Sequence, residues 1–141
     1  MKNEEESVYL NVLLDQVFDI LFVKQRGVND AEVIFVKILE LLEENERLKC
    51  WFLHCVRECA LSDEIDATAF TERPPNFIDP DLVLFMAHAT RWKEFFSIAQ
   101  ERKASLFTIK RFNREIDYSE LLLSSLSDDW DDADFYRFFN R

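Results

Sequence analysis

The sequence is poor in the residues that build turns, with a single glycine, Gly27, and only three prolines. Neither glycine-rich phosphate-binding pattern, G-x-G-x-x-G or G-x-x-x-x-G-K, can be written with one glycine. An all-β sandwich needs a tight turn between most of its strands, and this supply is too small for one. Phosphate-binding loops of these two kinds are therefore excluded, and a helical fold is favoured.

Basic residues are also in short supply: 17 Lys and Arg stand against 28 Asp and Glu, which gives the 141 residues a formal net charge of −11. Such a chain repels nucleic acids and anionic membranes and favours basic partners. Hydrophobic residues nevertheless make up 48% of the sequence, with 14 phenylalanines among them. This is enough to pack a core, so we expect residues 1–141 to fold as a single domain.

Three further absences bear on where the protein works. Residues 1–6 lack the positively charged start of a secretory signal. The longest apolar run, Leu82–Ala87, is far shorter than the ~20 residues that span a bilayer. Cys50, Cys55 and Cys59 are an odd number of cysteines on one short stretch, which is not the pattern of a disulfide framework. We therefore expect a cytoplasmic protein that does not bind membranes.

Apolar residues recur at helical spacing along most of the chain, which predicts an all-α bundle or orthogonal array of six to seven helices. The first helix, Ser7–Arg26, is apolar around most of its circumference and is followed by Gly27 as a stop signal. A helix of this kind is either central to the core or pressed against a partner, so residues 8–23 are a candidate homodimer seam. The side chains expected to be buried in either case are Leu13, Val17, Ile20 and Leu21.

Cap signals mark the starts of several later helices. They are Asn29–Glu32, Asp79–Pro80, Asp117–Glu120 and Ser127, the last of which opens an acidic C-terminal helix over 127–141. The polar patch 43–46 is expected to separate the second helix from a third over Arg47–Leu61. Residues 62–78, with Pro74–Pro75, are predicted to form the main loop, with a short helical turn near 66–70. Leu106–Ile109 alternates weakly and is the one place where a short strand is also allowed.

The charge is unevenly distributed. Residues 79–114 hold seven basic and four acidic side chains, whereas 115–141 hold eight acidic and two basic ones, and 1–78 hold sixteen acidic and eight basic ones. The simplest explanation is intramolecular charge balance, with the acidic tail folded back near the basic segment.

Residue types that bind metals or perform catalysis are few. Cys50, His54, Cys55 and Cys59 share one predicted helix, but they form two pairs at different azimuths, and one straight helix cannot bring both pairs to a tetrahedral ion. We therefore expect no metal or cofactor, and we expect the thiols to pack as small hydrophobic groups. His88 lies between two alanines on an apolar helix and is expected to be a core or boundary residue.

The C-terminal tail, residues 127–141, contains the most distinctive stretch of the sequence, Ser127–Tyr136. It has five aspartates within seven residues and aromatic side chains among them. It lacks the glycine that a calcium-binding EF-hand loop needs. Acids at a helix start also suit the helix dipole, which is a purely structural explanation. The alternative is a binding surface, in which acids raise the association rate and aromatic anchors slow dissociation. Its predicted partner-binding residues are Asp128, Asp129, Trp130, Asp131, Asp132, Asp134 and Tyr136.

In overall profile the chain is similar to bacterial immunity and antitoxin proteins, which are small, acidic, rich in helices and without catalytic motifs. This resemblance implies a non-enzymatic module that covers the basic active surface of a toxin or nuclease, so its partner is expected to be a basic protein. Two alternatives remain open. One is a homo-oligomeric structural or adaptor protein, and the other is a small helical enzyme centred on His88 and Arg91 with neighbouring carboxylates.

Overall fold

A computed structural model describes residues 2–61, 72–109 and 117–140, with the backbone alone at 2, 3 and 106–109. These residues form six α-helices and no strand, which confirms the predicted all-α class. The helices are α1 (Lys2–Phe18), α2 (Val28–Glu44), α3 (Glu46–Leu61), α4 (Pro80–Thr90), α5 (Lys93–Ile109) and α6 (Tyr118–Ser125). A π-helical turn, η1 (Asp19–Val23), continues α1, and two 3-10 turns, η3 (Asp131–Phe135) and η4 (Arg137–Asn140), end the described chain.

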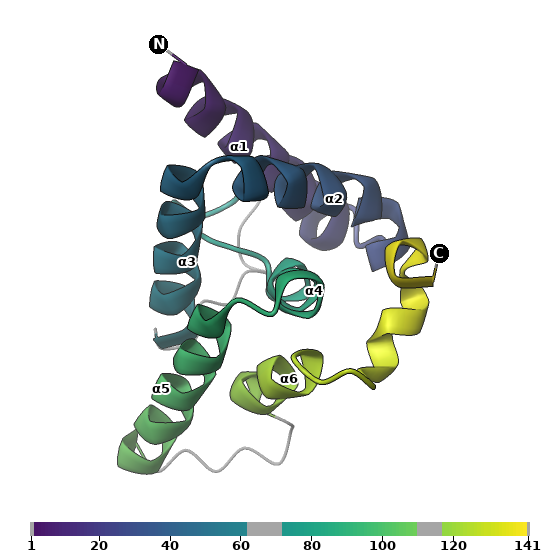
Figure 1. The fold of residues 1–141 in the computed structure, drawn as a ribbon. Helices are drawn as coiled ribbons and strands as arrows, with labels where there is room; N and C mark the ends of the chain where they lie inside the picture. Colours follow the sequence, from purple (N-terminus) through teal and green to yellow (C-terminus); the bar gives the residue numbers. More distant parts are fainter. Residues whose placement is uncertain (1, 62–71, 110–116, 141) are drawn as a thin grey trace.

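The helix α4 lies at the centre of the molecule, between α2 and α6 (Figure 1). Every residue from Leu82 to Ala87 is buried, as expected for a helix that is apolar on all sides. The helices α1 and α2 lie side by side across one end, α3 packs on α5, and α5 packs on α6. The C-terminal turns close the remaining side, near the start of α2 (Figure 1).

Part of the apolar arc of α1 is used within the monomer. Leu13 and Val17 are 3% and 1% exposed in the main core, which confirms their predicted burial, whereas Ile20 and Leu21 are only partly buried. The predicted stop at Gly27 is wrong, because η1 already ends at Val23.

Gly27 instead precedes α2 with extended backbone, and no side chain caps that helix. The capping box predicted at Asn29 is therefore wrong as well. The helix has already begun at Val28, whose side chain packs against the core.

Two of the other three predicted caps, Asp79 and Asp117, are confirmed. Asp79 Oδ1 accepts hydrogen bonds from Asp81 N at 2.7 Å and Leu82 N at 3.4 Å, and Asp117 accepts one from Ser119 N at 2.8 Å. Between α2 and α3 the helix breaks within the expected polar patch, at Asn45, whose Oδ1 accepts a hydrogen bond from Leu48 N at 3.1 Å.

Two predictions on the regular structure need a different account. Residues 106–109 belong to α5 and form no strand. The predicted turn near 66–70 lies outside the described residues. The described part of the main loop is tied to α1 by Arg73, whose Nε and Nη2 donate to Asp15 Oδ1 at 2.8 Å and Asn11 Oδ1 at 2.7 Å.

The predicted α-helix over 127–141 is wrong, because η3 and η4 replace it with breaks at Trp130 and Tyr136. Both aromatic side chains are buried. On a continuous α-helix, residues six apart point about 120° away from each other. Breaking the helix lets both rings turn towards α4. Within the described residues, no helix is long and apolar enough to cross a membrane.

Candidate functional site

Trp130 and Tyr136 hold the tail against the core. They are 7% and 3% exposed, their rings stack on each other with centroids 6.0 Å apart, and Tyr136 lies 5.1 Å from Phe85 of α4. From the sequence, these two rings were predicted to be exposed among the aspartates as anchors for a partner. They are core residues in the folded monomer, so neither presents a free face to a partner. The binding role of the tail as a whole stays a prediction.

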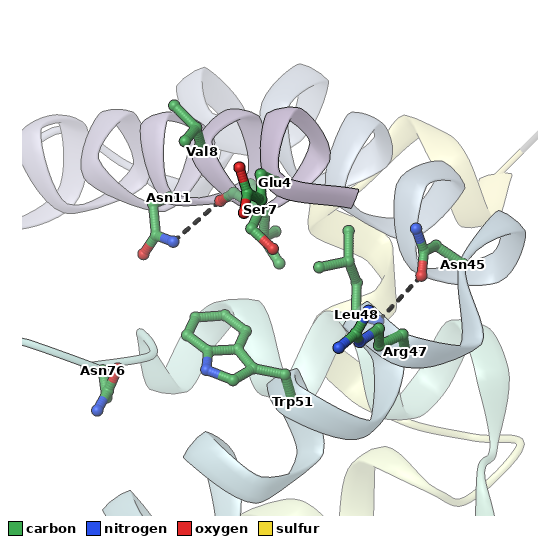
Figure 2. Close-up of a pocket in the computed structure, with 10 residues that line it drawn as sticks. Glu4, Ser7, Val8, Asn11, Asn45, Arg47, Leu48, Trp51 and Asn76 are labelled. Atoms are coloured by element: carbon green, nitrogen blue, oxygen red, sulfur yellow. Dashed lines mark hydrogen bonds between the residues drawn. The ribbon is translucent and has the colours of Figure 1, made fainter. Parts of the chain in front are cut away.

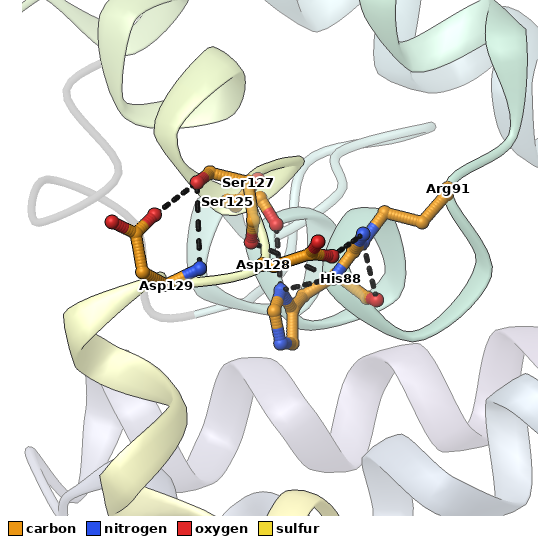
Figure 3. A network of polar contacts seen from close by, with 6 residues as sticks. All are labelled: His88, Arg91, Ser125, Ser127, Asp128 and Asp129. Carbon is orange, nitrogen blue, oxygen red and sulfur yellow. Dashed lines mark hydrogen bonds and ion pairs between the residues drawn. The ribbon is translucent and has the colours of Figure 1, made fainter.

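A polar network joins the end of α4 to the start of the tail (Figure 3). Arg91 Nη1 lies 2.8 Å from Asp128 Oδ1, while Arg91 Nε donates to the carbonyl of His88 at 3.0 Å. His88 Nδ1 lies 2.8 Å from the carbonyl oxygen of Ser125 and 3.3 Å from Arg91 Nη2. Asp128, one of the predicted binding residues, is therefore paired within the chain.

Arg91 is also the residue that ends α4. Its backbone is left-handed, with φ of 53°, a conformation that costs a non-glycine residue about 1 kcal/mol or more. His88, one turn earlier, packs against the rings of Trp130 and Phe139, at centroid distances of 5.0 and 4.6 Å. The histidine is thus a partly buried boundary residue that supports the tail, as the sequence indicated.

Asp129 also has a partner within the tail. Ser127 Oγ donates a hydrogen bond to the carboxylate of Asp129, and the backbone N–H of Asp129 donates to Ser127 Oγ at 3.4 Å. The bond from Ser127 lowers the pKa of Asp129 below its ordinary value.

The aspartates of η3 behave differently from Asp128 and Asp129. Asp131, Asp132 and Asp134 are exposed, and none of them forms an ion pair with another described residue. One of them, Asp132, lies close to an acid of another helix. Burial, and then the charge of Asp132, raises the pKa of Asp81 at the start of α4.

The pKa of Tyr136 is affected by the same carboxylates. Its pKa is raised first by burial and then by the carboxylates of α4, η3 and α2, which are Asp81, Asp132, Asp79 and Glu32. Glu32 also accepts a hydrogen bond from the backbone N–H of Arg137 at 2.8 Å, which fixes α2 to the tail. We define the acidic surface as Glu32, Asp81, Asp131, Asp132 and Asp134.

Sequence reasoning missed three members of this region. Glu32 and Asp81 lie far from the tail along the chain, so only the fold brings them to it. Phe135 is 60% exposed within η3, whereas Trp130 and Tyr136 on either side are buried. The α-helix expected over 127–141 gave no reason to predict that Phe135 is exposed while Trp130 and Tyr136 are buried.

The basic segment is balanced in part by the acids that follow it, as the charge distribution predicted. Arg102 Nη2 lies 2.8 Å from Asp117 Oδ1, and Arg102 Nη1 donates to the carbonyl of Ala60 at 2.7 Å. Burial pushes the pKa of Asp117 up, but hydrogen bonds from Arg102 and Ser119 outweigh it and leave the pKa below its ordinary value. With Arg91 and Asp128, this is the second ion pair between the two segments.

The thiols and imidazole of α3 point to different sides. Cys50 and His54 are exposed and Cys55 is buried, while Cys59 Sγ donates to the carbonyl of Asn76 at 3.5 Å. Burial, with a smaller contribution from Cys59, raises the pKa of Cys55 to about 11, so this thiol is protonated at neutral pH. Within the described ranges, no three His, Cys, Asp or Glu side chains are grouped so that they could hold a metal ion.

The site therefore consists of an acidic surface assembled from α2, α4 and η3 over a buried aromatic support, with one exposed ring, Phe135, beside it. Comparison with protein-family models, with curated proteins and with solved structures found no match to this chain.

Proposed function

We propose that this chain is a non-enzymatic acidic binding module for a basic protein, an inhibitor of the immunity or antitoxin type that covers the basic active surface of a toxin or nuclease. The observation that carries the proposal is the acidic surface. Glu32, Asp81 and Asp132, from three separate elements, all lie near Tyr136. Burial followed by the charge of Asp132 raises the pKa of Asp81, so at least this pair of like charges is in repulsion. A cationic partner relieves that repulsion, and the field of the surface accelerates its approach.

The fold supports this role by keeping the surface in place. Trp130 and Tyr136 fasten the tail to α4, and the exposed pair of Arg91 and Asp128 adds a weaker contact at its start. The aspartates of η3 are thus held in fixed positions before a partner arrives, which lowers the entropic cost of binding. Phe135 takes the place of the anchor that the sequence had assigned to Trp130 and Tyr136.

The two alternatives have less support. The homo-oligomer hypothesis depended on the apolar arc of residues 8–23, and Leu10, Leu13, Leu14 and Val17 use part of that arc in the monomer core, while Val8, Tyr9 and Val12 stay exposed. The enzyme hypothesis needs a free His88, and its partly buried ring packs against Trp130 and Phe139, with Nδ1 2.8 Å from the carbonyl oxygen of Ser125. We keep the cytoplasm as the proposed compartment because an odd number of cysteines on one short stretch fits a reducing environment.

The products of the two neighbouring genes provide the test, since inhibitors of this type are expected to be encoded beside their toxins. Each product is purified, and its association with this chain is measured by surface plasmon resonance from low salt to 1 M. We expect one product to be a cationic protein that this chain binds and inhibits. Asp131→Asn, Asp132→Asn and Asp134→Asn together should lower the association rate about tenfold at low salt, with the deficit vanishing near 1 M.

The matched control removes three other exposed acids that form no ion pair with a described residue, through Glu40→Gln, Glu72→Gln and Glu120→Gln. This control makes the net charge less negative by the same amount. An equal loss of association rate in both variants would therefore show that only net charge matters. The proposal fails if neither neighbour is bound, or if the control variant loses as much association rate as the triple Asn variant.

A further inference from the structure

A pocket of about 880 Å³ opens between the first half of α1, the start of α3 and the segment that precedes α4 (Figure 2). Its floor and walls combine the apolar side chains of Val8, Leu10, Leu48 and Trp51 with polar groups. In Figure 2 the indole of Trp51 lies under α1 and faces the space between the two helices. The pocket lies on α1 and α3, and none of the residues of the acidic surface lines it.

Hydrogen bonds fix both ends of the pocket. At one end Asn45 Nδ2 donates to Glu6 of α1, and Asn45 Oδ1 accepts from Leu48 N at 3.1 Å. At the other end Arg73 Nη2 donates to Asn11 Oδ1 at 2.7 Å. The gap between α1 and α3 is therefore preformed, and an incoming group does not need to open it.

An exposed apolar stripe on α1 continues from the pocket. Val8, which lines it, is 64% exposed, and Tyr9 and Val12 are 47% and 44% exposed. Val8 and Val12 are one helical turn apart and therefore lie on the same side of α1. Apolar residues that adjoin a pocket with a tryptophan form the kind of patch that marks an interaction site.

The rim of this pocket is acidic. Glu4 is exposed and lines it, and Glu44 and Glu46, both exposed, flank Asn45 at the turn between α2 and α3. Among the described residues, the lining itself holds one acid, Glu4, and one base, Arg47. The excess of negative charge therefore comes from Glu6, Glu44 and Glu46 beside Asn45, while Arg73 at the other end is paired with Asp15. The electrostatic field at the mouth of the pocket therefore favours a cationic occupant. A second copy of this chain, with its net charge of −11, would be repelled.

We propose that this pocket is a docking site for a cationic amphipathic helix of a partner protein. The helix inserts large apolar side chains, spaced three or four residues apart, against Trp51, Leu48 and Val8. Its Lys and Arg side chains then lie over Glu4 and the glutamates of the α2–α3 turn. The proposal concerns a second surface and does not depend on the acidic surface.

The test uses two synthetic peptides of about 18 residues, or five helical turns. One is an amphipathic helix of leucine and lysine, and the other has glutamine at every leucine position, so both carry the same charge. Binding to the full chain is measured by isothermal titration calorimetry and mapped by the shifts of backbone amide signals in NMR. We expect the leucine peptide to bind and shift signals of α1 and α3, and the glutamine peptide not to bind.

The variants localise the effect. Val8→Gln changes a side chain that is already 64% exposed, and it should weaken binding by about fivefold or more. Val33→Gln is the matched control, because Val33 is 66% exposed on α2 and does not line the pocket, and it should change nothing. Glu4→Gln should weaken binding at low salt, and Glu40→Gln on α2 should not.

Four results would overturn the proposal. The first is that the leucine peptide does not bind. The second is that the glutamine peptide binds equally well, which would indicate charge attraction alone. The variant with asparagine at 131, 132 and 134 loses the peptide while Val8→Gln retains it, which would place binding on the acidic surface and leave the proposed function standing. Sedimentation shows a dimer that Val8→Gln abolishes, which would make a second copy the occupant.

Discussion

Arg91 and Asp128 join the end of α4 to the tail through a 2.8 Å contact between Nη1 and Oδ1. This pair divides the aspartates that the sequence treated as one group. All four side chains are exposed, but Asp128 is ion-paired within the chain, whereas Asp131, Asp132 and Asp134 have no ion pair with a described residue. Charge balance and binding surface are therefore successive parts of the same tail rather than competing explanations of it.

The Arg91–Asp128 pair should contribute little to stability. The side chain of Asp128 is 97% exposed and that of Arg91 is 39% exposed, so water screens their attraction. Asp128→Asn is expected to lower the free energy of unfolding by less than about 1 kcal/mol in urea denaturation followed by circular dichroism. A loss above about 2 kcal/mol would contradict this and would mean that the pair, rather than the aromatic packing, holds the tail.

Arg102 should matter more than its exposed counterpart Arg57. The pair of Arg102 with Asp117 is three-quarters buried, and Arg102 also bonds the carbonyl of Ala60, whereas the pair of Arg57 with Glu101 is about half exposed. Arg102→Ala is expected to cost about 2–3 kcal/mol, because it leaves a partly buried carboxylate and a carbonyl without their donor. Arg57→Ala is the matched control and should cost less than about 1 kcal/mol by the same urea measurement. Equal costs would refute the distinction.

Asp79 should make stability depend on pH. Burial, and then the charge of Asp81, raises its pKa from 3.8 to about 7. The folded state therefore binds a proton more tightly than the unfolded state, so this group favours folding at low pH and its contribution is lost as pH rises from about 4 to 7. Asp117, whose pKa is lowered, acts in the opposite direction and loses its contribution only as pH falls below its ordinary value of 3.8.

Asp79→Asn isolates that effect, because asparagine caps a helix about as well as aspartate but carries no charge. We expect the variant to be more stable than the parent at pH 7 and to lose the decline in stability between pH 4 and 7. The measurement is urea unfolding at half-unit steps of pH. A variant whose pH profile runs parallel to that of the parent would show that other groups cause the decline.

The first helix offers a graded test of burial. Leu13 is 3% exposed in the main core, while Leu21 lies in η1 and is only partly buried. Leu13→Ala is expected to cost about 2–5 kcal/mol, and Leu21→Ala clearly less, since it removes fewer contacts. Thermal and urea unfolding of both variants, with sedimentation to confirm their oligomeric state, would decide. A cost at Leu13 below about 0.5 kcal/mol would place this face outside the core.

How far the sequence predicts this molecule depends on the range of the signal. The caps at Asp79 and Asp117 and the burial of Leu13 follow from neighbours within one or two turns, and they were predictable. The convergence of Glu32, Asp81 and Asp132 was not, because about fifty residues separate each from the next along the chain. Such contacts depend on how whole helices pack, and local periodicity carries no information about that.

The tail shows a second kind of failure. Its sequence from 127 onwards has a cap residue, acids for the helix dipole and apolar residues at helical spacing, so local preference indicates an α-helix. Packing overrides that preference, since Trp130 and Tyr136 both reach the aromatic cluster beside α4 only if the helix breaks. The exposure of Phe135 follows from the same break, and it was invisible to a periodicity argument.

Phe135 and Trp130 separate the two roles that the sequence had assigned to the tail. Trp130 is 7% exposed and packs on His88 and Tyr136, so Trp130→Ala should cost about 3–5 kcal/mol of unfolding free energy. Phe135 is 60% exposed, so Phe135→Ala should change stability by less than about 0.5 kcal/mol.

On a basic partner of the acidic surface, Phe135→Ala should mainly raise the dissociation rate, by about tenfold, because an aromatic anchor acts at short range after charge attraction has brought the partner in. Surface plasmon resonance gives the rates and urea unfolding gives the stabilities, and Phe96→Ala, which removes a 53% exposed ring from α5, controls for the loss of any exposed aromatic group. If Phe135→Ala and Phe96→Ala dissociate equally fast, the surface binds through charge alone and Phe135 is no anchor.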